Sequence, residues 1–267
     1  MLNGKKIGFI GAGNMGSAIA GGLISCGALK ASDILVTDID TKKADEFAKN
    51  GAKVLGSAVE IAKEADVVIL AVKPQVYAKV LVDLSEHTKP LYVSIAAGIT
   101  IDYIKQFFKD PVRVIRVMPN TPSLISEGMT VISTDKPATD DDLATVCEIF
   151  ESIGLIEVMQ ESYMNAVVAV SASSPAYVYM MIEAMADAAV LDGIPRETAY
   201  RLAAQAVAGS AKMVLETGIH PGDLKDKVCS PNGTTIRAVA SLEKSGFRSS
   251  IIGAMRECTK RANELTK

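Results

Sequence analysis

The sequence of 267 residues has no tryptophan, only two histidines and four cysteines, and no block of basic residues. Aromatic residues make up 5% of it and the formal net charge is −3, which argues against nucleic acid or an anionic membrane as a partner. Two histidines leave little for a metal centre, and we predict no bound metal. The cysteines are far apart and form no C-x-x-C pair, which predicts reduced thiols and neither a disulfide framework nor a zinc site.

We also expect no export signal. The apolar run that follows Lys5 and Lys6 is too short for a signal peptide and ends in a glycine-rich turn. A longer run rich in Ala, Met and Val covers residues 163–191, but it contains Pro175 and Asp187. We therefore expect a cytoplasmic protein, and a buried helix of a soluble domain in place of a membrane span.

The most informative stretch that is present is Lys5–Leu23, where a short apolar run leads into Gly-x-Gly-x-x-Gly and then into a helical segment. A strand, a glycine turn and a helix in this order are typical of a dinucleotide-binding site. Gly11 permits the tight turn, Gly13 lets the backbone approach a pyrophosphate, and Gly16 lets helix and strand pack closely. The helix N-terminus offers N–H groups to the phosphates. The predicted cofactor contacts of this turn are Gly11, Ala12, Gly13, Asn14, Met15 and Gly16.

Strand and helix patterns alternate through residues 1–160, and several apolar runs there are continuous, as in parallel strands covered on both faces. Repeated β-α-β units predict a doubly wound, Rossmann-type α/β domain that binds the dinucleotide. Only helical patterns follow over residues 161–267, which predicts an all-helical domain for substrate binding and dimerisation. Its helices are more apolar than one small core can hide, so we expect them to be buried against a second chain. Packing onto the chain's own sheet is the alternative.

Asp38 ends the second predicted strand, about 20 residues after the glycine turn. An acid at this point typically accepts a hydrogen bond from the 2′-OH of the adenine ribose, which favours NADH and repels the 2′-phosphate of NADPH. Lys42 and Lys43 follow closely and could soften that preference. In the alternative interpretation, Asp38 only caps the next helix.

Three further loops follow predicted strands, at Val72–Pro74, Ser94–Gly98 and Arg116–Pro122. Ligands of open α/β sheets lie outside the carboxyl ends of the strands, so we expect these loops to line one cleft with the glycine turn. Each loop taken alone could equally be a plain turn.

A polar stretch, His220–Thr235, precedes another predicted helix. Its backbone N–H groups and hydroxyls would bind a carboxylate or phosphate, although a simple N-capping turn uses the same residue types. No Lys, Arg or His lies between Glu161 and Ile194, where sugar-acid and hydroxyacid dehydrogenases of similar layout place a lysine. A protonated imine needs no such acid, so the pattern favours reduction of C=N over C=O.

The chain resembles pyrroline-5-carboxylate reductase nearly from end to end. The motifs that carry the resemblance are, in order, GFIGAGNMG, AVKP, SIAAGI, RVMPNTP, SPAY, LKDKVCSPNGTT and SLEKSGFR. The resemblance implies NAD(P)H-dependent reduction of 1-pyrroline-5-carboxylate to L-proline. It also implies a helical domain that interleaves with that of a partner chain in a homodimer, often within a decamer.

The resemblance also implies roles for single residues. Ser230, Gly233 and Thr234 would hold the substrate carboxylate together with Thr235, which as the catalytic residue would also hydrogen-bond the ring nitrogen. The implied cofactor contacts beyond the glycine turn are Ala71, Val72, Lys73, Pro74, Ala96, Ala97 and, near the nicotinamide, Asn120.

The chain departs from the family pattern at three places. Ser171–Tyr177 reads SASSPAY where members usually read SGSGPAY, so Ser174 replaces a glycine, and Asn232 replaces another. Added side chains there could narrow the pocket or restrict the backbone. Asp38 stands where many members carry an uncharged residue suited to NADPH. The alternatives are a related imine or small keto-acid reductase and a non-catalytic dinucleotide-binding regulatory protein.

Overall fold

The computed structural model describes Leu2 and residues 4–266. Its contacts divide the chain into two compact units. The first unit runs up to Ser173 and also includes the C-terminal segment from Cys258 onward. The second unit is Ser174–Glu257. The sequence analysis placed the boundary between the domains at residue 160, just ahead of the helical segment that begins at Glu161.

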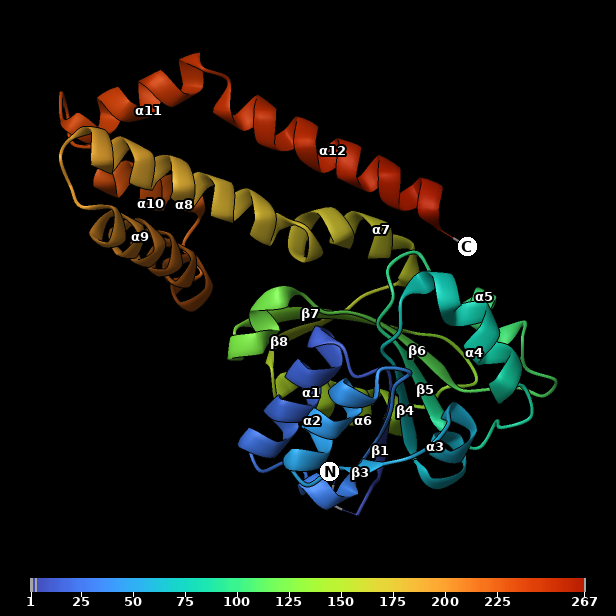
Figure 1. Ribbon diagram of the computed structural model, residues 1–267. Helices are drawn as coiled ribbons and strands as arrows, with labels where there is room; N and C mark the ends of the chain where they lie inside the picture. The colour runs from blue at the N-terminus through green and yellow to red at the C-terminus, as the bar shows by residue number, and fades with distance from the viewer. Residues whose placement is uncertain (1, 3, 267) are drawn as a thin grey trace. The chain divides into compact units, whose positions relative to one another are not determined.

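Within the described residues, the first unit has one sheet of eight strands in the order β3-β2-β1-β4-β5-β6-β7-β8 (Figure 1). The strands are β1 (Ile7–Ile10), β2 (Ile34–Thr37), β3 (Lys53–Val54), β4 (Val67–Leu70), β5 (Leu91–Ser94), β6 (Val114–Met118), β7 (Gly128–Thr134) and β8 (Gly154–Val158). All neighbouring strands are parallel except β6 and β7. The predicted doubly wound sheet is confirmed, whereas the reversal at β7 left no signal in the sequence.

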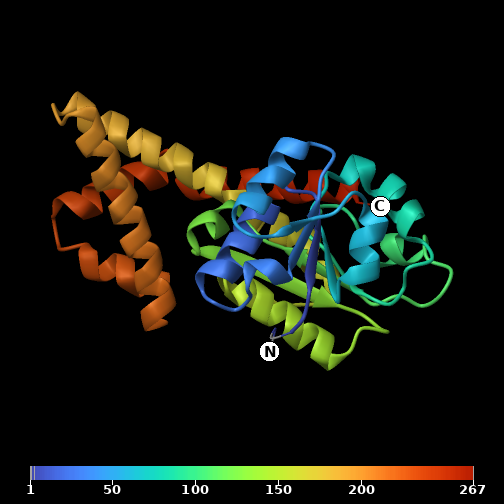
Figure 2. The ribbon, with the colours of Figure 1, turned by 60° about the horizontal axis from the view of Figure 1, so that its bottom comes forward.

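Helices cover both faces of this sheet (Figures 1 and 2). They are α1 (Asn14–Ser25), α2 (Thr41–Lys49), α3 (Ala58–Glu64), α4 (Tyr77–Leu84), α5 (Ile101–Lys105) and α6 (Asp140–Glu151). One core packs α1, α2 and α6 against the sheet, through side chains such as Ile19, Phe47 and Ile149. The other packs α3, α4 and α5, through side chains such as Leu81 and Ile104. Every residue of β1, β4, β5 and β6 is buried, which is the reason for their continuous apolar runs.

The segment Glu161–Leu191 is helical with one interruption. It consists of η4 (Glu161–Tyr163), α7 (Met164–Val167), the π-helical η5 (Val168–Ala172) and α8 (Ser174–Leu191). The interruption falls at Ser173, so Pro175 lies in the first turn of α8, where its missing N–H costs no hydrogen bond.

In the single chain, Ala186 is the only buried residue of α8, so the chain's own core does not supply the burial expected for this segment. Among the described residues, Glu161–Leu191 is long and apolar enough to cross a membrane by length and composition alone, with a mean hydropathy of 1.2. One such helix is weak evidence for a membrane span.

The second unit continues with α9 (Arg196–Thr217), α10 (Pro221–Val228), α11 (Thr234–Lys244) and the first part of α12 (Phe247–Leu265). Gly218 ends α9 in the left-handed conformation with φ +63°. The sequence prediction missed α10 and treated that stretch as part of a polar loop. Large apolar side chains are exposed in this unit, among them Leu191, Met180 and Leu215.

Candidate functional site

The glycine turn that joins β1 to α1 is shaped by two close approaches. Gly11 has φ +106°, and a Cβ atom there would lie 2.6 Å from the carbonyl oxygen of Ala71. A Cβ atom on Gly16 would lie 2.9 Å from the carbonyl oxygen of Gly11. A side chain at either position would therefore force the turn apart. Beside Gly13, by contrast, a Cβ atom would meet no atom within 4 Å, so the space in front of its backbone is open.

The N-terminus of α1 is left available by the residues around it. Gly13 is its N-cap and offers no side chain to the helix, and the first turn contains no acid. The positive end of the helix dipole therefore faces the open space beside Gly13 without a side-chain partner. A backbone of this shape fits a pyrophosphate.

Asp38 lies directly after β2 and contacts the glycine turn. Its Oδ2 accepts a 2.6 Å hydrogen bond from the Ala12 N–H, and its Oδ1 accepts a 2.8 Å bond from the Asp40 N–H. The cap of α2 is Asp40, whose Oδ1 accepts from the Lys42 N–H. The structure thus assigns helix capping to Asp40 and fixes the Asp38 carboxylate beside the glycine turn.

A pocket of about 390 Å³ adjoins this carboxylate, a volume in the range of ligand-binding pockets. Its lining residues are Ile10, Gly11, Thr37, Asp38, Ile39, Gly56, Ser57, Ala58, Val72, Val76, Lys79, Val80 and Asp83. Ile39 is fully exposed although it is apolar, and Val76 is 42% exposed. A flat apolar group such as adenine could cover both. Nothing in the sequence around Ile39 marked it as a site residue.

The loop after β4 contacts the glycine turn, whereas for the loop after β5 the structure gives the burial of its residues. The Ala71 N–H donates to the carbonyl oxygen of Ile10, which ties the end of β4 to the end of β1. Lys73 is exposed and forms the N-cap of η2 (Pro74–Val76). After β5, Ala96 is buried and Ala97 is exposed.

The buried side chain of Tyr77 joins the ends of β4 and β5. Its hydroxyl donates a 2.7 Å hydrogen bond to the Leu70 carbonyl oxygen and lies 3.0 Å from the Ser94 Oγ. Burial raises the pKa of Tyr77 far above its ordinary value, so the side chain stays neutral and keeps donating. Leu70 and Ser94 are the last residues of β4 and β5, so this contact fixes the edge of the sheet where the loops begin.

Asn120, the residue expected near the nicotinamide, has its side-chain amide bound to backbone groups. Its Nδ2 donates to the Ser171 carbonyl oxygen at 3.1 Å, and its Oδ1 accepts from the Met129 N–H at 2.9 Å. The side chain is 9% exposed and joins the start of β7 to the π-helical segment. Its amide is therefore engaged with backbone groups, which the sequence did not indicate.

Arg116 is a buried cation in β6 that forms an ion pair with Glu161. The Arg116 Nη1 donates to the Glu161 Oε1 at 3.0 Å, and the same oxygen accepts from the Ile101 N–H at 2.9 Å. Among the described residues, the Nε and Nη2 of Arg116 have no hydrogen-bond partner. One carboxylate oxygen thus joins β6, the start of α5 and the start of the helical segment. The signal in the sequence was a charged residue inside an apolar strand.

The polar turn ahead of α11 belongs to the second unit. The Gly233 N–H donates to the Ser230 carbonyl oxygen at 3.0 Å, and Asn232 has φ +56°. Asparagine is among the residues that tolerate this left-handed conformation, so it can replace a glycine there. A Cβ atom on Gly233 would lie 2.4 Å from the Ser230 Oγ and 3.1 Å from the Ser230 carbonyl oxygen, so a side chain there would push the Ser230 hydroxyl out of its position.

Gly233 is the N-cap of α11, and no side chain caps this helix. Thr234 is exposed and Thr235 is half-buried in its first turn. Hydroxyls and a free helix N-terminus in one place suit a carboxylate. Ser174 has no positive φ, so serine adds no backbone strain at that former glycine.

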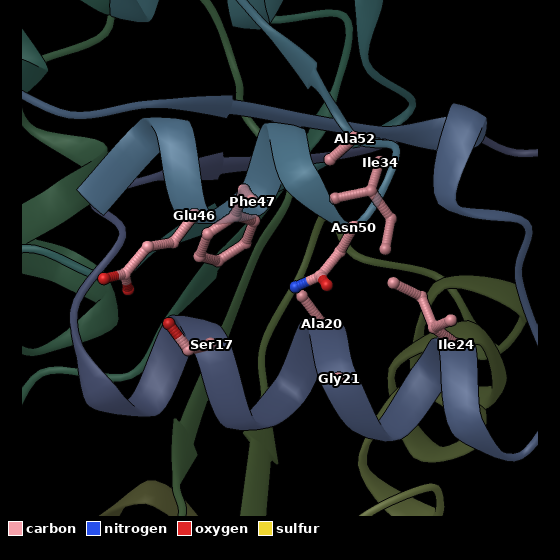
Figure 3. A pocket seen from close by; sticks show the side chains of 9 residues that line it. All are labelled: Ser17, Ala20, Gly21, Ile24, Ile34, Glu46, Phe47, Asn50 and Ala52. Carbon is pink, nitrogen blue, oxygen red and sulfur yellow. The ribbon is translucent and has the colours of Figure 1, made fainter. Parts of the chain in front are cut away.

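A second hollow of about 130 Å³ lies between α1 and α2 (Figure 3). Ser17 and Gly21 of α1 face Glu46 and Phe47 of α2 and Asn50 at its C-terminal end. Apolar side chains line the rest of this hollow. It is smaller than the pockets that bind organic ligands. Among the described residues, no three His, Cys, Asp or Glu side chains are grouped to hold a metal ion.

Comparisons with known proteins match the whole chain. A family model described as pyrroline-5-carboxylate reductase dimerisation matches residues 161–265, and one described as NADP oxidoreductase, coenzyme F420-dependent, matches residues 6–98. The chain is 51% identical to a pyrroline-5-carboxylate reductase of Escherichia coli, over 98% of this chain and 99% of that protein.

Solved structures agree with this match. A pyrroline-5-carboxylate reductase from Coxiella burnetii superposes with a TM-score of 0.92 at 36% identity, over 99% of this chain and 100% of that one. A pyrroline carboxylate reductase of Plasmodium falciparum with NADP bound has a TM-score of 0.88 at 30% identity, over 99% of each chain. The resemblance inferred from the motifs is therefore confirmed.

Proposed function

The chain belongs to the pyrroline-5-carboxylate reductase family, and from this premise we propose which of its residues carry out the reaction. It is an oxidoreductase that reduces 1-pyrroline-5-carboxylate to L-proline with NAD(P)H. The observation that carries this conclusion is the similarity along the full length, which includes both the glycine turn and the turn ahead of α11. The other imine or keto-acid reductases and the non-catalytic role are not favoured.

The first unit would hold the cofactor, which supplies the hydride when it is bound. The glycine turn and the N-terminus of α1 would bind the pyrophosphate, because Gly13 leaves its backbone open and no acid lies in the first turn. The pocket beside Asp38 would take the adenosine. Ala71, Val72, Lys73, Pro74, Ala96 and Ala97 would lie along the rest of the cofactor. Asn120 would lie near the nicotinamide, with its amide held in place by its two hydrogen bonds to backbone groups.

The turn Ser230–Thr235 would bind the substrate carboxylate. The unpaired N-terminus of α11 and the hydroxyls of Ser230, Thr234 and Thr235 supply donors, and the helix dipole favours an anion. Gly233 would allow the close approach of Ser230, since any side chain there would displace it. Thr235 would in addition hydrogen-bond the ring nitrogen and orient the C=N bond toward the hydride donor.

The reacting bond explains why no strong acid is needed. A protonated imine already carries the positive charge that attracts a hydride, so residues that position the ring suffice. The segment between Glu161 and Ile194 contains no Lys, Arg or His, which supports an imine in place of a ketone.

The family model for dimerisation over residues 161–265 supports homo-oligomerisation of this chain. We propose a dimer through residues 161–267, possible assembly into a decamer, and a dinucleotide-binding domain over residues 1–160. Dimerisation would cover apolar side chains of α8 and α9 such as Met180 and Leu215. We also propose the cytoplasm as the compartment, because all four cysteines are free thiols.

The substitution Thr235→Ala tests the role of the turn, with Thr235→Ser as the matched control. We expect Thr235→Ala to lower kcat/KM for pyrroline-5-carboxylate by on the order of tenfold to a hundredfold, since one hydrogen bond to a charged group is lost. The NAD(P)H dissociation constant should stay within about twofold, and serine should restore most of the turnover. Equal losses of turnover and cofactor binding would show that the turn is only structural.

A further inference from the structure

We propose that Asp38 makes the cofactor pocket of this chain select NADH over NADPH. This inference depends on the proposed cofactor site, and it concerns a position at which the chain departs from many family members. It rests on the fixed position of the carboxylate, on the charges that line the pocket and on the placement of the nearby lysines.

The Asp38 carboxylate is held in place by two backbone groups. The Ala12 N–H donates to one of its oxygens and the Asp40 N–H to the other. Rotating the side chain away from the pocket would break both hydrogen bonds and leave two N–H donors without an acceptor. The carboxylate is therefore a fixed negative charge at the pocket wall and cannot move aside for a phosphate.

Each carboxylate oxygen has further lone pairs beyond the one that accepts from the backbone. A ribose 2′-OH can donate to such a lone pair. A 2′-phosphate has a charge of about −1.5 to −2 at neutral pH and few protons to donate. The same carboxylate is thus a partner for the ribose of NADH and repels that of NADPH.

The other charged groups of the pocket do not cancel the negative charge of Asp38. Its ionisable lining residues are Asp38, Lys79 and Asp83. Lys79 and Asp83 lie one turn apart on α4, so the carboxylate of the second partly offsets the ammonium of the first. Two carboxylates against one ammonium leave the pocket wall negative.

The two lysines that could have softened the preference are not part of the pocket wall. Neither Lys42 nor Lys43 lines the pocket. The Lys43 Nζ lies 3.9 Å from the Asp40 Oδ2, so it pairs with the cap of α2. The residue next to Asp38 is Ile39, which offers apolar surface and no positive charge to the 2′ position.

The size of the effect follows from the two charges. At a separation of about 4–6 Å in a partly solvated site, a carboxylate and a phosphate repel enough to weaken binding on the order of tenfold to a hundredfold. Because salt screens this repulsion, the preference should narrow as ionic strength rises.

The test is a titration of the full-length protein with NADH and with NADPH in the absence of substrate, following the fluorescence of the bound reduced nicotinamide. The wild-type protein is compared with Asp38→Ser, Asp38→Asn and Asp83→Asn. Asparagine keeps an acceptor for the Ala12 N–H, so it separates loss of charge from loss of the turn. Asp83→Asn removes the same charge from another part of the pocket.

We expect the wild-type protein to bind NADH at least about tenfold more tightly than NADPH, with a smaller ratio in 1 M salt. Both Asp38 variants should reduce the ratio to about threefold or less, whereas Asp83→Asn should largely preserve it. Equal wild-type affinities, or a ratio that Asp38→Asn leaves unchanged, would overturn the inference. Failure of both dinucleotides to bind would instead refute the proposed cofactor site.

Discussion

Glu161→Ala should destabilise the protein because it removes the carboxylate that is bound to the buried Arg116. The side chain of Arg116 is 2% exposed and that of Glu161 is 29% exposed. Deleting one partner of a fully buried ion pair costs about 3 to 5 kcal/mol. Water can reach Glu161, so the cost here should be lower, about 2 to 3 kcal/mol. This cost includes the loss of the hydrogen bond from the Ile101 N–H, whose acceptor is removed.

Two further variants make this expectation specific. Glu161→Gln keeps a neutral oxygen for the Ile101 N–H and should cost only about 1 to 1.5 kcal/mol. Glu157→Ala removes an exposed carboxylate from neighbouring β8 and should change stability by less than about 0.5 kcal/mol.

The assay is thermal unfolding followed by circular dichroism at one fixed protomer concentration, because the stability of an oligomer depends on concentration. We expect melting temperatures about 5 to 10 °C lower for Glu161→Ala and about 2 to 5 °C lower for Glu161→Gln. If Glu161→Ala melts within about 1 °C of the wild-type protein, the ion pair does not join the three segments as we describe.

Two other predictions concern buried polar groups. Asn120→Asp keeps the acceptor for the Met129 N–H but places a carboxylate against the Ser171 carbonyl oxygen, so chemical denaturation should show a loss of about 2 kcal/mol in stability. An unchanged stability would contradict the role of the Asn120 side chain in joining β7 to the π-helical segment. Tyr77→Phe should cost about 1 to 2 kcal/mol at pH 7. Burial raises the pKa of Tyr77 above its ordinary 10.0, so its stabilising effect is complete below pH 10 and is lost as pH rises further. The stability gap between the two proteins should therefore shrink above pH 10, and a constant gap would contradict this.

The sequence was most informative where local chemistry decides the structure. The turn at Gly11 and Gly16 has the two close approaches expected of a fingerprint, and Gly218 ends α9 in the left-handed conformation that glycine permits. These features depend on a few neighbouring residues, so one sequence is enough to recognise them.

Features that depend on long-range contacts could not be read in this way. Pairing of Glu161 with Arg116 and of Asn120 with Ser171 joins residues far apart in the chain. The reversal at β7 depends on how the loop after β6 returns, which apolar periodicity does not encode. The sequence left open whether Asp38 only caps the next helix, and the geometry assigns that cap to Asp40.

The helical half shows another limit of sequence reasoning. Its apolar patterns correctly indicated helices, and they also predict burial of the segment Tyr163–Leu191. In the single chain, Ala186 is the only buried residue of α8. Hydrophobic periodicity indicates that a helix face is buried, but it does not indicate which surface covers that face. The covering surface can belong to a partner chain as well as to the chain's own core.

The central claim is that this chain reduces the C=N bond of pyrroline-5-carboxylate. The most direct measurement mixes the purified protein with that substrate and reduced dinucleotide, follows the loss of dinucleotide absorbance and quantifies proline. We predict one proline formed for each dinucleotide oxidised, and no comparable oxidation with a small 2-keto acid. Oxidation with the keto acid alone, or dinucleotide binding without any proline, would contradict the account.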